Sequence, residues 1–444
     1  MSREPGVSRV ERVFRNARAA AGGPLADLAV GGGRFLAVTP AAGAPAGPPG
    51  DAGHPPIEEV NLEGRVVLPG FIESHIHLDK AFLEERRPNL SGTLRDAIAI
   101  TLELKRAVTK EDIRQRSERA LRLLLRHGTT RARLQVEVDP IVRLRGMEAA
   151  LELREAWRGR FGLQLVVFPQ EGIEQQPGTE GLMREAMRMG GDAVGGVPYN
   201  DTDPERHLDI VFKLAGESGK GVDLHLDFTD DPGDRRIESV CRRTLAAGLQ
   251  GRVAVGHLTS LGAMDEGTIA RIAGLIAEAG IHVLPLPATD LFLCGRGPVP
   301  PRHRSLTPVK ALLRAGANVS IASNNIRNAF TPSGRGDLCS PPTPPRCWGW
   351  RIATASPPAR TPTSPSSTPR TTTTSSSTSP RSAGSSRPGG SSWRICGRRG
   401  GGRGCRGVSP YAPEKNTRKG NPPPRQAVGS GRAWAISPGV MART

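Results

Sequence analysis

The residues best suited to chemistry are histidines that follow or end apolar runs. His75 and His77 lie two residues apart in Phe71–Asp79, which reads FIESHIHLD. On a strand, residues i and i+2 face the same side, so both imidazoles can point toward one place. His225 and His257 each come at the end of a later apolar run. Imidazoles on rigid strands are good ligands for a divalent ion, so this set predicts a metal site.

The remaining histidines lack this placement. His127 precedes Gly128 at the end of a helical stretch, where a positive side chain interacts favourably with the helix dipole. Four others show no link to a strand end. We expect structural or solvated roles for His54, His207, His282 and His303.

Eight short apolar runs, typical of buried strands, recur along the chain. They are Phe71–Ile76, Ala132–Val136, Gln164–Phe168, Ala193–Val197, Val222–Leu226, Arg252–Val255, Ile281–Leu284 and Asn318–Ala322. Stretches between them have helical periodicity, as in Glu111–His127 and Glu266–Gly280. This alternation predicts an α/β protein with a parallel (β/α)8 TIM barrel, and an open doubly wound sheet is the second choice. Chemistry in such barrels sits at the carboxyl ends of the strands, where the histidines lie.

Residues 1–70 do not follow this rhythm. Leu25–Val38 predicts two short strands joined by three glycines, Ala41–Pro56 predicts a loop, and Arg65–Leu68 predicts a further strand. We therefore expect a small N-terminal β appendage over residues 1–70 and the barrel over residues 71–338.

The charge of the chain is concentrated at its C-terminal end. The 444 residues carry 61 Lys and Arg against 43 Asp and Glu, a net charge of +18. Residues 339–444 hold 17 of the bases and one acid, Glu414. Within 361–392, 20 of 32 residues are Ser or Thr, which predicts a disordered tail. The net positive charge of the chain thus says little about the binding partner of the barrel. Nucleic-acid binding through the tail is only a minor alternative.

Other features bound the class of protein. No apolar run approaches the roughly 18 residues of a membrane span, so we expect no membrane partner. The first 20 residues contain no apolar segment typical of a secretory signal. Six widely spaced cysteines suggest neither a zinc motif nor a disulfide framework. A reducing, cytoplasmic location is the expectation.

Several motifs resemble one enzyme family. Val67–Asp79 resembles the signature of the amidohydrolase superfamily, and the continuation through Lys80 is similar to isopropylammelide amidohydrolases. Phe168–Ile173 resembles the corresponding segment of bacterial cytosine deaminases, and Gly256–Thr259 is similar to their sixth-strand motif. The motifs fall in the family's order, and the resemblance covers roughly residues 25–338.

The resemblance implies a barrel with one divalent metal ion, zinc or iron. His75, His77 and His225 match the ligand positions. His257 matches the position that orients the nucleophile or the substrate, and Gln170 matches a substrate-amide contact. The implied activity is metal-assisted hydrolysis of a non-peptide C–N bond in a small cyclic amidine or amide, such as cytosine deaminase-like deamination. A small heterocycle is the expected partner, and a homo-oligomer is left open.

Two positions depart from the family pattern. The family has an Asp at the end of strand eight that acts as ligand and base, whereas the matching residue here is Asn324, whose amide is neutral. Cytosine deaminases carry a Glu three residues after the fifth-strand histidine, and here that position is Phe228. Asp227, on the same strand side as His225, is a candidate to transfer protons instead. A second hypothesis is therefore a catalytically impaired relative that binds metal or ligand without turnover.

The resemblance ends abruptly near Leu338. Repeated Thr codons of the form ACG give repeated Asp codons in a displaced frame, and Ser codons can give Val. The run Thr371–Ser379 could therefore hide a strand of the family in another frame. We expect a reading-frame shift near Leu338, and the alternative is a genuine Ser/Thr/Pro/Arg-rich tail. Resequencing of the locus distinguishes the two.

Overall fold

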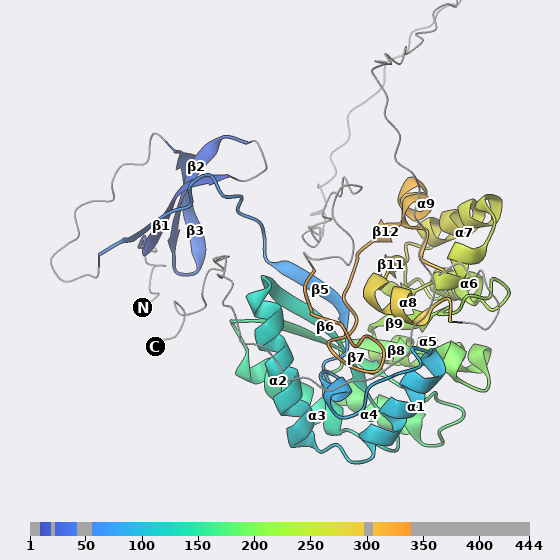
Figure 1. Cartoon of the computed structure of the whole chain (residues 1–444). Helices are drawn as coiled ribbons and strands as arrows, with labels where there is room; N and C mark the ends of the chain where they lie inside the picture. Colours follow the sequence, from blue (N-terminus) through green and yellow to red (C-terminus); the bar gives the residue numbers. More distant parts are fainter. Residues whose placement is uncertain (1–8, 19–22, 42–55, 297–304, 339–444) are drawn as a thin grey trace, which may run out of the picture. The chain divides into compact units, whose positions relative to one another are not determined.

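The computed structural model describes residues 9–18, 23–41, 56–296 and 305–338 (Figure 1). The predicted tail, residues 339–444, lies outside the described residues, and so do His54 and His303. Nucleic-acid binding through the tail therefore stays a prediction. In the described part of the chain, no helix is long and apolar enough to cross a membrane.

The larger sheet is parallel and has eight strands. They are β5 (Phe71–Ile76), β6 (Thr129–Glu137), β7 (Gly162–Phe168), β8 (Ala193–Gly196), β9 (Gly221–Leu226), β10 (Val253–His257), β11 (His282–Leu284) and β12 (Asn318–Val319). Their spatial order is the sequence order, from β5 to β12, so the order reversal of a doubly wound sheet is missing from the described strands. The sheet curls until Ile76 of β5 pairs with Asn324 in an isolated parallel bridge. The predicted (β/α)8 class is confirmed.

Helices follow most of the strands. They are α1 (Leu94–Lys105), α2 (Lys110–Arg126), α3 (Arg145–Ala156), α4 (Thr179–Met189), α5 (Pro204–Ser218), α6 (Ile237–Ala246), α7 (Glu266–Glu278), α8 (Pro287–Leu293) and α9 (Val309–Arg314). Short 3-10 turns occur at Leu83–Glu85, Pro198–Asn200 and Thr259–Ala263.

Local sequence signals explain the clearest helix boundaries. The Thr109 side chain accepts a hydrogen bond from the Asp112 backbone N–H, which caps the start of α2. Gly128 follows α2 with a φ of 82°, a left-handed conformation that glycine adopts without strain. The predicted helix Glu111–His127 is thus confirmed to within one residue at each end.

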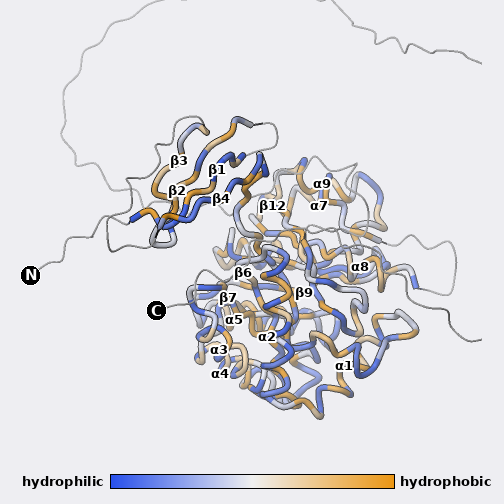
Figure 2. Tube along the Cα trace, turned by 60° about the vertical axis from the view of Figure 1, so that its left-hand side comes forward, coloured by the Kyte–Doolittle hydropathy of each residue, from blue (hydrophilic) through white to orange (hydrophobic). Residues whose placement is uncertain are grey.

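The core of the barrel runs along its strands, where hydrophobic residues are concentrated (Figure 2). Leu165, Val167 and Phe168 of β7 are fully buried. On α2, Leu121 and Leu124 are buried against this core. Burial of apolar surface stabilises the folded state by roughly 25 cal/mol per Å². Because the strands pack tightly in this core, their ends are held in fixed positions.

The N-terminal part forms a separate four-stranded sheet. Its strands are β1 (Arg12–Arg18), β2 (Leu25–Gly31), β3 (Arg34–Pro40) and β4 (Glu58–Asn61), in the order β3-β2-β1-β4. The sequence predicted β2 and β3 but missed β1, in which only Val13 and Ala17 are buried. The predicted strand Arg65–Leu68 is wrong, since only Val66 pairs, in an isolated bridge with Arg18.

Candidate metal centre and active site

Three histidines converge at the carboxyl ends of β5 and β9. The Nε2 atom of His225 lies 3.1 Å from that of His75 and 2.9 Å from that of His77. The candidate ligand atoms of all three residues lie within 4.8 Å of one another, and all three side chains are buried. The two-residue spacing on β5 therefore brings both imidazoles to one point, as predicted from the strand period.

The surroundings keep these imidazoles neutral. Burial lowers the pKa of His77 well below its ordinary value, and the nearby Lys80 lowers it further. Burial also places the pKa of His225 well below its ordinary value, with a further contribution from His75. Because a metal ion binds the neutral imidazole, this environment favours the ligand form.

Polar side chains hold the His75 ring through its Nδ1 atom, whereas its Nε2 atom faces His225. Its Nδ1 lies 3.3 Å from Nε2 of Gln135 and 3.7 Å from Oδ1 of Asp223. Arg133 in turn pairs with Asp223 at 2.8 Å. A Cβ atom at Gly256 of β10 would lie only 3.2 Å from Cε1 of His75, so the glycine leaves room for the ring.

His257 ends β10 and faces the same hollow. Its Nδ1 lies 2.7 Å from Oδ1 of Asp290 on α8, and both side chains are buried. The carboxylate can only accept, so in the neutral ring Nδ1 carries the proton and Nε2 is left as an acceptor. The ring stacks on Phe228, with centroids 3.9 Å apart and an interplanar angle of 14°. Phe228 therefore forms an aromatic wall beside His257.

Asn324 lies directly beside the ligand strand. Its amide nitrogen donates to Oγ1 of Thr289 at 3.1 Å, whereas its buried Oδ1 has no hydrogen-bond partner. The backbone φ of 64° is left-handed, a conformation that Asn tolerates better than most residues and that is often found at functional sites. The free carbonyl oxygen is thus available to a ligand in the site.

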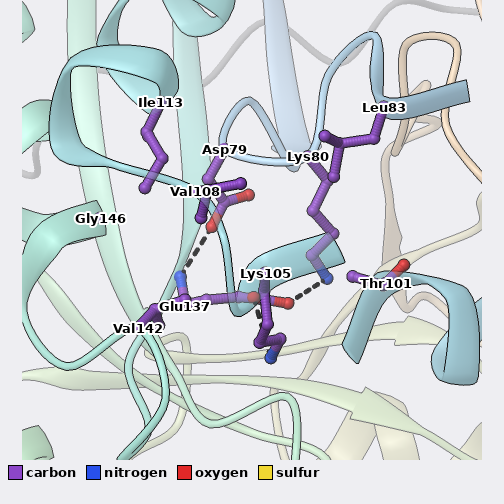
Figure 3. Close-up of a pocket in the computed structure, with 10 residues that line it drawn as sticks. All are labelled: Asp79, Lys80, Leu83, Thr101, Lys105, Val108, Ile113, Glu137, Val142 and Gly146. Atoms are coloured by element: carbon purple, nitrogen blue, oxygen red, sulfur yellow. Dashed lines mark hydrogen bonds and ion pairs between the residues drawn. The ribbon is translucent and has the colours of Figure 1, made fainter. Parts of the chain in front are cut away.

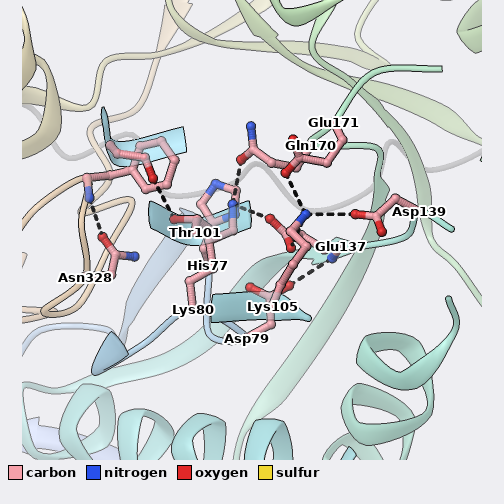
Figure 4. Close-up of polar contacts among 12 residues, drawn as sticks. His77, Asp79, Lys80, Thr101, Lys105, Glu137, Asp139, Gln170, Glu171 and Asn328 are labelled. Carbon is pink, nitrogen blue, oxygen red and sulfur yellow. Dashed lines mark hydrogen bonds and ion pairs between the residues drawn. The ribbon is translucent and has the colours of Figure 1, made fainter. Parts of the chain in front are cut away.

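A hollow of about 260 Å³ lies over these residues. Gln170, which follows β7, lines the hollow together with Lys80, whose Nζ donates to Gln170 Oε1 at 2.6 Å (Figure 4). Phe228 and Phe330 supply aromatic surface. A hollow that combines aromatic faces with several fixed polar groups suits a small flat ring that carries polar substituents.

Asp227 does not lie among the residues that line this hollow. Its φ of 51° turns the chain at the end of β9, so the strand alternation stops there. The carboxylate accepts from the backbone N–H groups of Arg236, at 2.7 Å, and Ile237, at 3.1 Å, at the start of α6. This contact favours a helix-capping role over the proton transfer predicted for Asp227.

Sequence reasoning missed several groups that shape the site. Asp290 belongs to the apolar segment Pro287–Leu293, and a buried acid in such a segment is the signal that could have revealed it. Thr289 and Phe330 carry no comparable signal. His207 is structural, as expected: its Nε2 accepts from the Val197 N–H at 2.9 Å.

A divalent metal ion fits this donor set. Two nitrogens bound at about 2.1 Å to a tetrahedral ion lie about 3.4 Å apart, close to the spacings between these imidazoles. The buried Oδ1 of Asn324 is a further unpaired donor atom in the same hollow. His75, His77 and His225 would hold the ion, and Asn324 could add a neutral oxygen.

Comparisons with known proteins agree on one family. The model of the Amidohydrolase family matches residues 58–99 and 81–337, and so ends next to Leu338. Pterin deaminase of Rhizobium rhizogenes is 31% identical over 309 residues, which are 69% of this chain and 68% of the relative. N-isopropylammelide isopropyl amidohydrolase of Pseudomonas sp. is 30% identical over 288 residues, 63% of this chain and 68% of the relative. The crystal structure of 5-methylcytosine deaminase from Klebsiella pneumoniae liganded with 5-fluorocytosine matches with a TM-score of 0.67 and 31% identity, and covers 73% of this chain and 78% of that one.

Proposed function

The chain belongs to the amidohydrolase family, and from this premise we propose that it is a metal-dependent hydrolase of the non-peptide C–N bond in a small cyclic amidine or amide. The observation that carries the proposal is the convergence of three neutral, buried imidazoles beside a hollow with aromatic walls. The class of substrate follows from the relatives, which are a pterin deaminase, an isopropylammelide amidohydrolase and a 5-methylcytosine deaminase.

Each polar group has a separate part in this chemistry. A divalent ion held by His75, His77 and His225 would supply Lewis acidity and would lower the pKa of water toward neutrality, so that hydroxide is available as the nucleophile. His257, with Nδ1 held by Asp290, presents Nε2 as the group that takes and returns a proton. Gln170 binds the ring through its amide. Asn324 can contact the ion or the substrate but cannot accept a proton at useful pH.

The test is a comparison of metal-free and metal-loaded protein. The full chain is stripped with a chelator and reloaded with Zn²⁺ or Fe²⁺. Release of ammonia or amine is then measured on amino-pyrimidines, amino-triazines and cyclic amides. We expect release that requires the ion. Equal rates with and without the ion would contradict metal dependence.

The second candidate is a relative that binds a heterocycle without hydrolysing it. It is favoured by the resemblance to the family, which implies a carboxylate base where this chain has Asn324 and an acid where it has Phe228. In the structure, Phe228 stacks on His257. Saturable binding of an amino-pyrimidine by the loaded protein, with no release of amine, would favour this candidate. The predicted cytoplasmic location stays a prediction. Among the described residues, Cys241 and Cys294 are buried and form no disulfide.

A further inference from the structure

The first and last strands of the barrel meet with little strand pairing. β5 and β12 lie at the two ends of the eight-stranded sheet, whereas all other neighbouring strands in it form parallel ladders. Within the described residues, an isolated bridge between Ile76 and Asn324 is the one strand pairing across this junction, the seam. The seam nevertheless carries His75 and His77 on one side and Asn324 on the other. Side chains must therefore help to hold its two sides in register.

The buried carboxylate of Glu73 crosses the seam. Glu73 lies two residues before His75 on β5, so its side chain points to the same side of the strand, and none of its surface is exposed. Its two oxygens each lie 3.1 Å from the backbone nitrogen of Ser323, and Oε2 accepts from the Ser323 hydroxyl at 2.6 Å. Oε1 also lies 3.3 Å from the backbone nitrogen of His75. One side chain thus bonds a candidate metal ligand and the residue that precedes Asn324.

These contacts take the place of bonds that a regular ladder would supply. A backbone N–H group that is buried without an acceptor costs free energy, and the Glu73 carboxylate accepts from the Ser323 N–H where no carbonyl of β5 does. The chain turns directly afterwards, since the φ of Asn324 is 64°. Because Ser323 is the residue before this turn, its position determines where the Asn324 side chain enters the site.

A second carboxylate holds the other flank of the same segment. Asp79 follows β5, and its Oδ2 accepts from the backbone N–H of Glu137 on β6 at 2.9 Å (Figure 3). Both residues line a hollow of about 310 Å³ whose other walls are largely apolar. The ladder between β5 and β6 shifts register between Glu73 and Ile76, so regular pairing does not fix the strand end there. The segment with both histidines is therefore held by Asp79 toward β6 and by Glu73 toward β12.

We propose that Glu73 is a positioning residue for the candidate metal centre: by bonding Ser323 and the main chain of His75, it sets the position of the Asn324 amide relative to the His75 imidazole. The inference rests on the proposed function, in which the histidines hold a divalent ion. Glu73 acts through hydrogen bonds to its neighbours and not through its charge. Groups that orient metal ligands change metal affinity by about 10–100-fold when they are removed.

The test measures how the full chain binds Co²⁺ alone. Co²⁺ accepts nitrogen and oxygen ligands as Zn²⁺ does, and its visible absorption bands respond to the arrangement of those ligands. The variant His77→Ala gives the baseline of Co²⁺ bound elsewhere on the chain. Glu73→Met keeps a side chain of similar length and removes both acceptors. We expect its affinity for Co²⁺ to fall about ten-fold or more and its absorption bands to shift from those of the parent.

Glu73→Gln separates hydrogen bonding from charge. The Gln oxygen can accept from the backbone N–H groups of Ser323 and His75, and its amide nitrogen can donate to the Ser323 hydroxyl. Parent affinity and parent absorption bands should therefore return in this variant. Ser323→Ala removes the hydroxyl contact and keeps the backbone contact, so its affinity for Co²⁺ should fall by about three-fold, less than in Glu73→Met.

Ser74→Ala is the matched control at the same seam. The Ser74 hydroxyl lies 3.2 Å from that of Ser320, and the alternation of β5 places it on the opposite side of the strand from Glu73. Urea unfolding of the metal-free variants measures stability separately from metal binding. Whatever stability Ser74→Ala loses, its affinity for Co²⁺ and its absorption bands should stay at parent values.

Each outcome decides the proposal. Parent-like affinity and bands in Glu73→Met would overturn it, and so would a loss in Glu73→Gln as large as in Glu73→Met, because charge would then be the cause. A change in Ser74→Ala equal to that in Glu73→Met would reduce the role of Glu73 to general stability. If Glu73→Met does not fold, equal affinities of Ser323→Ala and Ser74→Ala overturn the inference. A parent that binds no Co²⁺ above the baseline would contradict the proposed function itself, whereas failure in the variants alone would leave it standing.

Discussion

The main chains of His77 and Asn324 are hydrogen-bonded to each other across the closure of the barrel. The N–H of His77 donates to the carbonyl of Asn324 at 2.9 Å, and the N–H of Asn324 donates to the carbonyl of His75 at 3.1 Å. Asn324 is therefore fixed beside two candidate metal ligands by the same bonds that close the sheet. Any change of charge at this side chain acts directly on the site.

Asn324→Asp should increase the rate of hydrolysis if the missing carboxylate limits the chemistry. The two side chains are nearly equal in size, so packing should hardly change. The new carboxylate would offset part of the charge of the ion and accept a proton, and positioned bases contribute about 10²–10⁴-fold. The measurement is kcat/KM on a cytosine-like substrate.

Asn325→Asp is the matched control for this change. Asn325 is also buried and also donates to Thr289 Oγ1, at 3.2 Å, but its Oδ1 already accepts from Asn328. The same charge one residue away should bring no gain in rate. A fall in activity of Asn324→Asp on the natural substrate would mean that Asn324 serves as a hydrogen-bond donor. No change in metal affinity or rate would place Asn324 outside the chemistry.

Gln170→Ala should raise KM more than it lowers kcat. The Gln170 amide has no proton to transfer and is held to bind the ring, so its loss weakens binding in the ground state and the transition state alike. Steady-state kinetics on an amino-heterocycle that the parent hydrolyses would measure both constants. Parent-like kinetics would mean that Gln170 is a rim residue without a role in binding.

Asp201→Asn should destabilise the protein at neutral pH, and the difference should shrink in acid. Burial raises the pKa of Asp201, but the contact with His207 and backbone N–H groups, among them that of Ile173, outweigh it and hold the pKa well below its ordinary value of 3.8. A depressed pKa stabilises the fold above the ordinary value and loses that effect as pH falls below it. Urea unfolding at pH 7 should show a loss of about 1–2 kcal/mol.

The same comparison at about pH 3 completes this test. There the Asp201 carboxyl begins to take up a proton in the unfolded parent but not in the folded parent, so the difference between the free energies of unfolding of parent and variant should narrow. Because Asp201 also binds the segment that follows Gln170, the variant should show a higher KM at neutral pH. A stability difference that is constant from pH 7 to pH 3 would contradict the assigned pKa.

Replacing Ile72 and Ile321 together by Thr should reduce self-association. These side chains lie at the two ends of the closed sheet and are 45% and 40% exposed. Strands of such barrels are normally covered by a following helix, but no helix follows β12 in the described part of the chain. Sedimentation should show less association in the variant. Leu245→Thr, at an exposed position on α6 (39%), is the control that should behave like the parent.

The sequence predicted features that depend on local periodicity. The placement of His75 and His77 on one side of β5 follows from the strand period, and the ends of α2 follow from Thr109 and Gly128. Contacts across the barrel were not predictable in this way, because they join distant residues. His257 and Asp290 are 33 residues apart and Lys80 and Gln170 are 90 apart.

The position of Asp227 shows a different limit. A two-residue alternation predicts that it shares a side with His225, but the left-handed turn at Asp227 ends the strand and turns the carboxylate toward α6. The reading-frame shift near Leu338 also stays a prediction, because residues 339–444 lie outside the described part of the chain. A confirmed, uninterrupted frame through codon 338 would rule it out.

In the proposed function, His75, His77 and His225 together hold a divalent ion, and the metal content of His77→Ala tests this assignment. Removing one imidazole takes away a ligand that lies 2.9 Å from His225 Nε2, so the ion should bind far more weakly. Parent and variant are purified in parallel, and metal per chain is measured by atomic spectroscopy, with His282→Ala, remote from the cluster, as control. We predict about one ion per chain in the parent and the control and a small fraction of that in His77→Ala. Full occupancy in His77→Ala would contradict the ligand assignment.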